Sequence, residues 1–518
     1  MELADQERSS SADIFSPVRE GTTSRPRSDL RYRQILLDAD EFTTKYELDD
    51  VRTEIRAAAL MLDDPDDIGR VEGLTEGDVA ALRLERRPPP IFSRIIVDWW
   101  WSFPRVCTIG GILWGFIEQL PSPLIPEKDF SPDPPSGRQT VAELMRSGLP
   151  TIACCIIGVW CAVPMLRYSG RRVAACRALA LKSAGLVGGL AFRAAYLRVL
   201  AGVLSTAASG MVYCTIPMYL AETSPSSKRG SVLLTWYLSQ RVGILFSAVG
   251  SQLSGDDTSA LAYWLMMLLP VALGACFWNS PESPYWYTRQ GEMREAYKAL
   301  REYRDSAVQT SRDLYRIYSF GTKETPGNKR GRRTMRRSLQ ALVNSTIFIL
   351  AEIIPETLGF LMTVSMFHMG QNGGLEAYRL LPLLYLCLAL ILCIILLSIT
   401  LIERVGRPGL VLPSMLLMTL SLFATKMSAP TYAVFNGVQY LGAPLTLTVP
   451  QMAMYLASAV YPIEISCSIG SEPVMATTLT IVLLKLAIVE FSAVRIFSST
   501  PPEFIPNYCL GAPLSLFL

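Results

Sequence analysis

Glutamates and arginines recur in this sequence where a long apolar run gives way to a polar segment. Glu222 and Glu282 each follow such a run, Arg171 follows a third, and Arg229 lies shortly after Glu222. One guanidinium can donate two parallel hydrogen bonds to one carboxylate, and such charge-assisted pairs are strong. The pattern predicts a latch of paired charges at one end of a helical bundle. The alternative is a set of ordinary interfacial charges that face water.

A second group of polar residues lies inside the apolar runs themselves. Glu118 and Gln119 end the run GGILWGFIEQLP, and Glu352 and Glu356 are four residues apart, so they share one helix face. A charge within hydrocarbon costs at least about 2.5 kcal/mol, which makes such residues candidates for binding protons or cargo. Two alternatives stay open. Glu118 marks the outer end of its helix, and Glu352 and Glu356 face an aqueous vestibule.

Other kinds of chemistry find little support in the sequence. The chain has a single histidine and no CxxC pair among its 11 cysteines, so we expect no metal site and no cofactor. No nucleophile–base set or phosphate-binding loop is present, so we do not expect an enzyme. A net charge of +3 with no basic stripe argues against a nucleic-acid partner.

The elements that position these residues are long apolar helices. Half of the 518 residues are hydrophobic and only 18% are charged, which indicates an all-α polytopic membrane protein embedded in a lipid bilayer. The apolar runs are about 20 residues long, as a membrane-spanning helix requires. The predicted spans are 103–120, 148–168, 173–195, 198–221, 231–252 and 260–279, and then 342–369, 379–402, 408–428, 431–461 and 473–497.

The spans divide the chain into four predicted parts. These are an N-terminal tail (1–95), a first helical bundle (96–285), a central loop (286–338) and a second bundle (339–518). The tail is partly disordered near its start and is expected to form one or two short amphipathic helices after residue 32. Basic residues gather in the even-numbered connections, which predicts a cytoplasmic N-terminus.

Four motifs at the helix ends resemble those of the sugar porter family of the major facilitator superfamily. They are PMYLAETSPSSKRG, PESPYWYTRQG, RYSGRR and ERVGRP, and the likeness is greatest to fungal members with a long N-terminal tail. The motif positions that form the expected gate are Gly158, Gly170, Arg171, Arg172, Pro217, Glu222, Arg229, Gly230, Glu282, Glu403, Arg404, Gly406 and Arg407.

The resemblance implies two bundles of six helices that rock about a central cavity. It also implies a monomer of the plasma membrane that moves a sugar-like solute, in some members together with protons. The chain ends in YCLGAPLSLFL without a clear twelfth span, so we expect the last helix to be missing or truncated.

The cavity positions depart from the family pattern. Tyr237 stands where a sugar-binding glutamine is usual, with Gln240 one turn on, and Glu356 stands at one of a pair of expected glutamines. The family's helix-four arginine falls on Gly202, and Arg198 lies one turn earlier. Three hypotheses therefore stay open: a sugar transporter, a transporter of another metabolite, and a non-transporting sensor or degenerate relative. Further polar candidates in the second bundle are Asn436 and Gln439.

Overall fold

The computed structural model describes residues 26–63, 74–86, 105–118, 137–226, 228–254, 259–322 and 472–498, and the isolated positions 339, 343, 396, 399, 401–402, 405 and 416. Every regular element in these ranges is a helix. The predicted spans 342–369, 379–402, 408–428 and 431–461 lie outside the described residues apart from those isolated positions.

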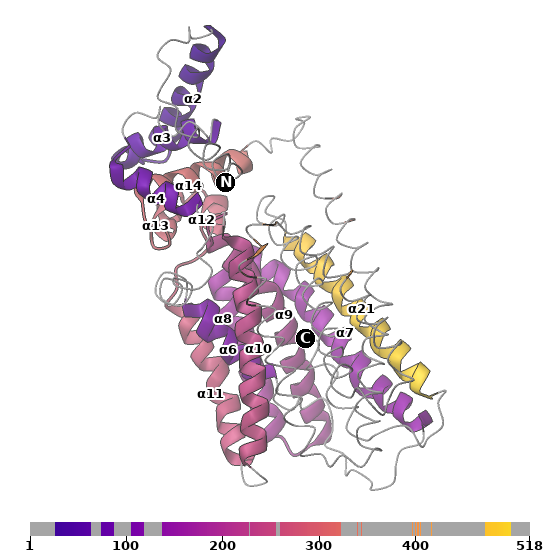
Figure 1. Ribbon diagram of the computed structural model, residues 1–518. Coiled ribbons are helices and arrows are strands. Elements are labelled where there is room, and N and C mark those ends of the chain that lie inside the picture. Colours follow the sequence, from indigo (N-terminus) through magenta and orange to yellow (C-terminus); the bar gives the residue numbers. More distant parts are fainter. Residues whose placement is uncertain are drawn as a thin grey trace, which may run out of the picture.

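In the described part of the chain, seven long helices stand side by side as a bundle (Figure 1). The first six are consecutive, and α21 comes from the far end of the chain and packs along α7. The other main pairings join α8 to α9, α6 to α10, α7 to α9, and α11 to both α8 and α6. The helices are α6 (Arg105–Glu118), α7 (Gly137–Ser169), α8 (Arg171–Ala191), α9 (Ala195–Thr223), α10 (Arg229–Ser254), α11 (Ser259–Trp278) and α21 (Glu472–Ser498).

These helices agree with the predicted spans to within a few residues at almost every end. The exception is the start of α7, which precedes the predicted start of its span by 11 residues, from 148 back to 137. Its part that is apolar enough to cross a bilayer is Leu149–Ser169, close to the predicted span 148–168. The first turns of α7 carry polar residues, and the span was predicted only from the apolar run that follows them.

Glycines let the helices of the bundle approach one another closely. A Cβ atom added at Gly158 of α7 would lie 1.9 Å from the carbonyl oxygen of Ala207 on α9. A Cβ atom at Gly115 of α6 would lie 2.1 Å from the carbonyl oxygen of Gln240 on α10. Small residues at such contacts are typical of helices that pack within membranes. We call these two contacts the glycine seams.

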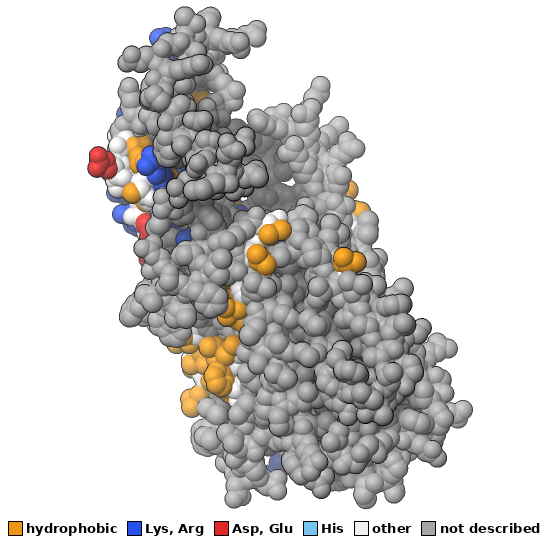
Figure 2. All heavy atoms as spheres, in the orientation of Figure 1, with side chains coloured by type: hydrophobic (Ala, Val, Ile, Leu, Met, Phe, Trp, Pro, Cys, Tyr) orange, Lys and Arg blue, Asp and Glu red, His pale blue; other side chains and the backbone are white. Residues whose placement is uncertain are grey.

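The outside of the bundle presents apolar side chains. Leu268, Val271 and Trp278 on α11 are each about 60% exposed, as side chains that face lipid would be. Figure 2 shows a hydrophobic patch on the side of the bundle, whereas the coloured charged side chains gather mainly above it. Within the described part of the chain, Leu149–Ser169, Arg171–Ala191 and Ala195–Thr223 meet the length and hydropathy expected of membrane spans.

A separate group of helices lies at one end of the bundle (Figure 1). It combines helices of the N-terminal tail with helices of the central loop, so the predicted amphipathic tail helices are confirmed. Its core joins Phe42 and Ile55 of the tail to Leu300 and Leu314 of the loop. We call it the tail–loop module. Its elements are α2 (Pro26–Lys45), η1 (Asp49–Val51), α3 (Arg52–Asp63), α4 (Glu76–Arg86), α12 (Pro284–Gln290), α13 (Met293–Arg301) and α14 (Ala307–Thr322).

A buried carboxylate makes the stability of this module depend on pH. Burial alone would raise the pKa of Asp313, but the charges and hydrogen bonds of Arg304 and Arg312 outweigh it and hold the pKa below its usual range. The Asp313 carboxylate therefore contributes stability that is present above the unfolded pKa, near pH 4, and is lost as the pH falls through the folded pKa.

We expect Asp313→Asn to lower the melting temperature of the protein most at pH 5–8. The difference from the wild type should shrink steadily as the pH is lowered below about 4, because the wild-type carboxylate then also becomes neutral. Melting followed by intrinsic fluorescence between pH 3 and 8 measures this difference. A difference that stays the same throughout that range would contradict the role given to the charge.

Candidate functional site

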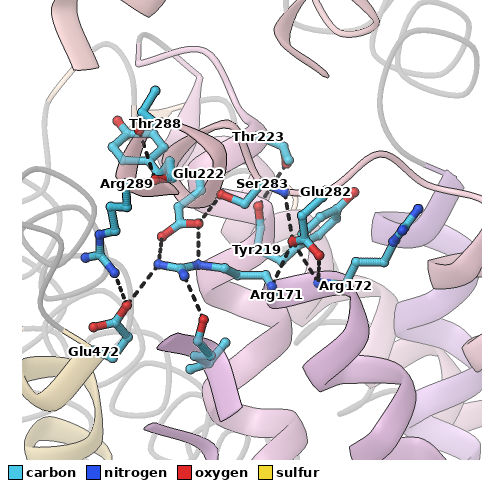
Figure 3. A network of polar contacts seen from close by, with 12 residues as sticks. Arg171, Arg172, Tyr219, Glu222, Thr223, Glu282, Ser283, Thr288, Arg289 and Glu472 are labelled. Carbon is cyan, nitrogen blue, oxygen red and sulfur yellow. Dashed lines mark hydrogen bonds and ion pairs between the residues drawn. The ribbon is translucent and has the colours of Figure 1, made fainter. Parts of the chain in front are cut away.

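A cluster of arginines and carboxylates lies at the end of the bundle that carries the tail–loop module (Figure 3). Arg171 is its centre and is 1% exposed. Its Nε and Nη2 atoms donate to the two carboxylate oxygens of Glu222 at 2.8 and 3.0 Å, which is a bidentate pair. The same Nη2 donates to Oε1 of Glu472 at 3.1 Å, and Nη1 donates to the carbonyl oxygen of Leu166 at 2.9 Å.

The fold brings these residues together from distant parts of the sequence. Arg171 opens α8, Glu222 lies at the end of α9, and Glu472 begins α21. Arg289 of α12 donates to the same Oε1 atom of Glu472, and the hydroxyl of Ser283 donates to Glu222. We call Arg171, Arg172, Glu222, Glu282, Ser283, Arg289 and Glu472 the arginine–carboxylate cluster.

Glu282 is held by backbone rather than by guanidinium groups. The N–H groups of Arg171, Arg172 and Ser283 donate to its carboxylate at 2.7, 3.0 and 2.9 Å. Arg171 and Arg172 form the first turn of α8, so the carboxylate also lies at the positive end of a helix dipole. Burial raises the pKa of Glu282 above its ordinary value, and the three N–H donors oppose this shift.

Gly170 is required for this arrangement. It precedes α8 with a φ of +85°, a conformation that side chains with a Cβ atom rarely adopt. A Cβ atom there would also lie 2.5 Å from Oε2 of Glu282. The glycine of the RYSGRR motif therefore both turns the chain and makes room for the carboxylate.

The remaining predicted gate residues lie on several elements. Pro217 lies within α9, and Gly230 is buried in the first turn of α10. Arg229 donates to the hydroxyl of Tyr285 at 2.8 Å, and its guanidinium lies 5.9 Å from the centre of that ring. Gly158 contributes to a glycine seam and not to the cluster. Glu403, Arg404, Gly406 and Arg407 lie outside the described residues.

The predicted cargo and proton candidates that the structure describes lie on α6, α9 and α10. Tyr237 and Gln240 are both buried in α10. Glu118 is the last residue of α6, and Arg198 is exposed in the first turn of α9, at the end opposite the cluster. Gln119, Glu352, Glu356, Asn436 and Gln439 lie outside the described residues.

Several buried charges were missed by sequence reasoning. Glu472 is 1% exposed, and its position in the first turn of a helix is also what an ordinary acid at a helix N-terminus shows. Lys182 and Lys485 lie inside spans and are buried, and Lys182 donates to Ser209 on α9 at 2.9 Å. A charged residue within an apolar run was the signal that could have found both lysines. Among the described residues, no group of His, Cys, Asp or Glu side chains is placed to hold a metal ion.

Glu472→Gln tests the bond between α21 and the other helices. The amide keeps the size of the side chain but removes the charge that Arg171 and Arg289 share. We expect a loss of about 1–3 kcal/mol in unfolding free energy, the typical cost of a buried charge-assisted hydrogen bond. Denaturant unfolding in detergent measures it, with Glu302→Gln at an exposed acid as the control. Equal stability of the two variants would contradict the role of Glu472.

A family model for sugar and other transporters matches residues 139–487 of the 518-residue chain. The chain belongs to this family. It is therefore a multi-pass integral membrane protein of a transporter family, as the motifs predicted. The expectation that it is closest to fungal members stays a prediction.

Individual relatives match a shorter part of the chain. A galactose–proton symporter of Escherichia coli is 30% identical over 124 residues, which are 23% of this chain and 26% of the symporter. The major myo-inositol transporter of Bacillus subtilis is 32% identical over 107 residues, covering 19% and 22%. The chain thus spans about a quarter of the length of the curated relatives it matches.

Solved structures extend the likeness over most of the chain. The proton:xylose symporter XylE, bound to 6-bromo-6-deoxy-D-glucose, has a TM-score of 0.56 and 18% sequence identity. The match covers 81% of this chain and 92% of that protein. This likeness establishes the major facilitator fold, which confirms the predicted fold class.

Proposed function

We propose that this protein moves a sugar or a similar small polar solute across a membrane by alternating access. The arginine–carboxylate cluster is the latch that closes one end of the transport path. By the distribution of basic residues in the connections, that end faces the cytoplasm.

One observation supports the assignment of the cluster as a latch. The Nη2 atom of Arg171, in the first half of the chain, bonds to Glu472 on α21, in the second half, at 3.1 Å. The two halves of a major facilitator protein rock against each other during transport. Opening at this end must therefore break that bond and the bond from Arg289 to the same carboxylate. The Arg171–Glu472 pair is buried on both sides, so breaking it is costly unless water enters to replace it, whereas Arg289 is 32% exposed.

Proton coupling is part of the proposal and depends on Glu118. The relatives include a galactose–proton symporter and a proton:xylose symporter. Glu118 stands at the end of α6, where proton-coupled members of the family carry an acid followed by glutamine. We infer that its carboxyl group takes up and releases the coupled proton.

A second candidate function is transport of a solute other than a sugar on the same scaffold. Tyr237 replaces the expected sugar-binding amide, and the guanidinium of Arg241 lies 4.8 Å from the centre of its ring. The Tyr237 ring and the Arg241 guanidinium present an aromatic face and a positive charge, whereas an amide presents a hydrogen-bond donor and an acceptor to sugar hydroxyls. This observation favours a cargo that is not a plain hexose.

Uptake of labelled sugars by a yeast strain that lacks hexose uptake tests the proposal. Cells that express the protein at the plasma membrane should accumulate a sugar, and a protonophore should abolish accumulation against a gradient. Glu118→Gln should then allow equilibration but no accumulation. Correct surface targeting without uptake of any sugar would reject the sugar cargo and favour the second candidate. Normal accumulation by Glu118→Gln would reject the proton role.

A further inference from the structure

The N-terminal tail lies against the loop helices that carry part of the latch. The largest of its contacts joins α3 to α14. Ile55 of α3 is fully buried in the core of the tail–loop module. Phe42 of α2 lies with its ring centre 4.4 Å from that of Tyr318. These contacts make the tail a structural part of the loop rather than a free appendage.

Helix α4 of the tail is firmly placed. Thr75 and Asp78 form a reciprocal cap at its start, in which the Thr75 backbone N–H donates to the Asp78 carboxylate at 3.2 Å and the Asp78 N–H donates back to the Thr75 hydroxyl at 3.2 Å. Ser306, just before α14, donates to the other oxygen of Asp78. Gln309 of α14 donates to the carbonyl oxygen of Ala81 at 3.1 Å. Side chains of the loop thus bind both the side chains and the backbone of α4.

A continuous series of charged hydrogen bonds then leads from α4 to the latch. Glu85 accepts from Arg312 at 2.9 Å, and Arg312 also donates to Asp313 at 3.0 Å. Asp313 accepts from Arg304 at 2.7 Å, and Arg304 donates to the carbonyl oxygen of Thr223 at 3.0 Å. Thr223 is the last residue of α9 and follows Glu222 of the latch directly.

The loop helices reach the latch by a second route. Helix α13 contributes Met293 and Leu300 to the core shared with the tail, and α13 packs against α12. Helix α12 carries Arg289, which donates to Glu472 on α21. The tail is therefore connected, through the loop helices, to two parts of the latch: the end of α9 and Arg289 of α12.

We propose that the N-terminal tail is a built-in clamp that holds the latch end of the transporter closed. Its attachment to α13 and α14 keeps Arg304 against α9 and Arg289 against α21, so detaching the tail increases the fraction of molecules open at this end. The proposal rests on the alternating-access function above for its physiological meaning.

Hydrogen exchange measured by mass spectrometry on the full-length protein in lipid nanodiscs tests the clamp. Ile55→Asp removes the apolar contact, and Thr53→Asp, at an exposed position of the same helix, is its matched control. Glu85→Gln weakens the series of hydrogen bonds, and Glu76→Gln, at an exposed acid of α4, is its control. Exchange is read in the peptides that contain the end of α9 and α12, and in those that contain α3 and α4.

We expect Ile55→Asp to speed exchange at the end of α9 and in α12 on the order of tenfold, because local opening becomes easier. Glu85→Gln should give a smaller rise in the same peptides, and both controls should match the wild type. Faster exchange in α3 and α4, with wild-type rates at the end of α9 and in α12, would overturn the clamp. Because exchange needs no cargo, a protein that moves no sugar in yeast but shows the rise keeps the clamp and loses only the proposed cargo.

Discussion

Arg171→Ala will be among the most damaging single substitutions in the protein. It leaves the carboxylates of Glu222 and Glu472 buried, at 2% and 1% exposure, without the guanidinium that lies between them. Removing one partner of a buried ion pair costs about 3–5 kcal/mol, because the remaining charge is left in a poorly solvating site. We expect a loss of that order in unfolding free energy and a fall in uptake of at least about tenfold.

Two further variants make this result specific. Arg171→Lys retains the charge but cannot donate in the planar, bidentate geometry that Glu222 accepts, so its effect should be intermediate. Arg177→Ala removes an exposed arginine of the same helix and should change stability by less than about 0.5 kcal/mol. Denaturant unfolding and uptake in the yeast assay measure the three variants. Wild-type stability of Arg171→Ala would refute the central place of this residue in the cluster.

Gly158→Ala should have the second large effect, although it adds only one methyl group. The new Cβ atom would lie 1.9 Å from the carbonyl oxygen of Ala207, and α7 and α9 would have to separate. Overpacking of this kind costs about 1–3 kcal/mol, and Gly158→Leu should prevent assembly of the bundle altogether. Gly210→Ala faces the same strain from the other helix, since its Cβ atom would lie 2.1 Å from the carbonyl oxygen of Cys155.

Gly274→Ala supplies the matched control. A Cβ atom at Gly274 of α11 meets no other atom within 4 Å, so alanine should be neutral or slightly stabilising through its higher helix propensity. The melting temperature and the yield of monodisperse protein after detergent extraction compare these variants. A glycine seam that tolerates alanine as well as Gly274 does would show that α7 and α9 can separate at little cost.

The sequence predicts the spans well because membrane helices must be long and apolar. The predicted ranges 198–221 and 473–497 correspond to α9 at Ala195–Thr223 and to α21 at Glu472–Ser498. The amphipathic tail helices were also predicted. What covers their apolar face was not, because an apolar stripe indicates that a partner exists but does not identify it. Only the structure places Ile55 and Phe42 against helices more than 200 residues away.

The sequence predicted those residues of the candidate site that belong to a motif. Arg171, Glu222 and Glu282 were all expected to take part, and the first two form the expected bidentate pair. Glu282 was expected beside guanidinium groups, but its contacts are with the backbone at the start of α8. Glu472 was missed because it lies 301 residues from Arg171 in the chain and belongs to no motif. Local patterns do not record a contact between such distant segments.

The shared carboxylate of Glu472 has a consequence for exchanging parts between relatives. Its single oxygen Oε1 accepts from Arg171 on α8 and from Arg289 on α12, while Arg171 also depends on Glu222 of α9. These four helices lie at widely separated positions in the sequence, so exchanging one of them replaces only some of the charges that neutralise one another. A chimaera that takes α21 from a relative with a neutral residue at this position would inherit an excess of buried positive charge. A functional chimaera therefore needs compatible residues at all four of these positions: 171, 222, 289 and 472.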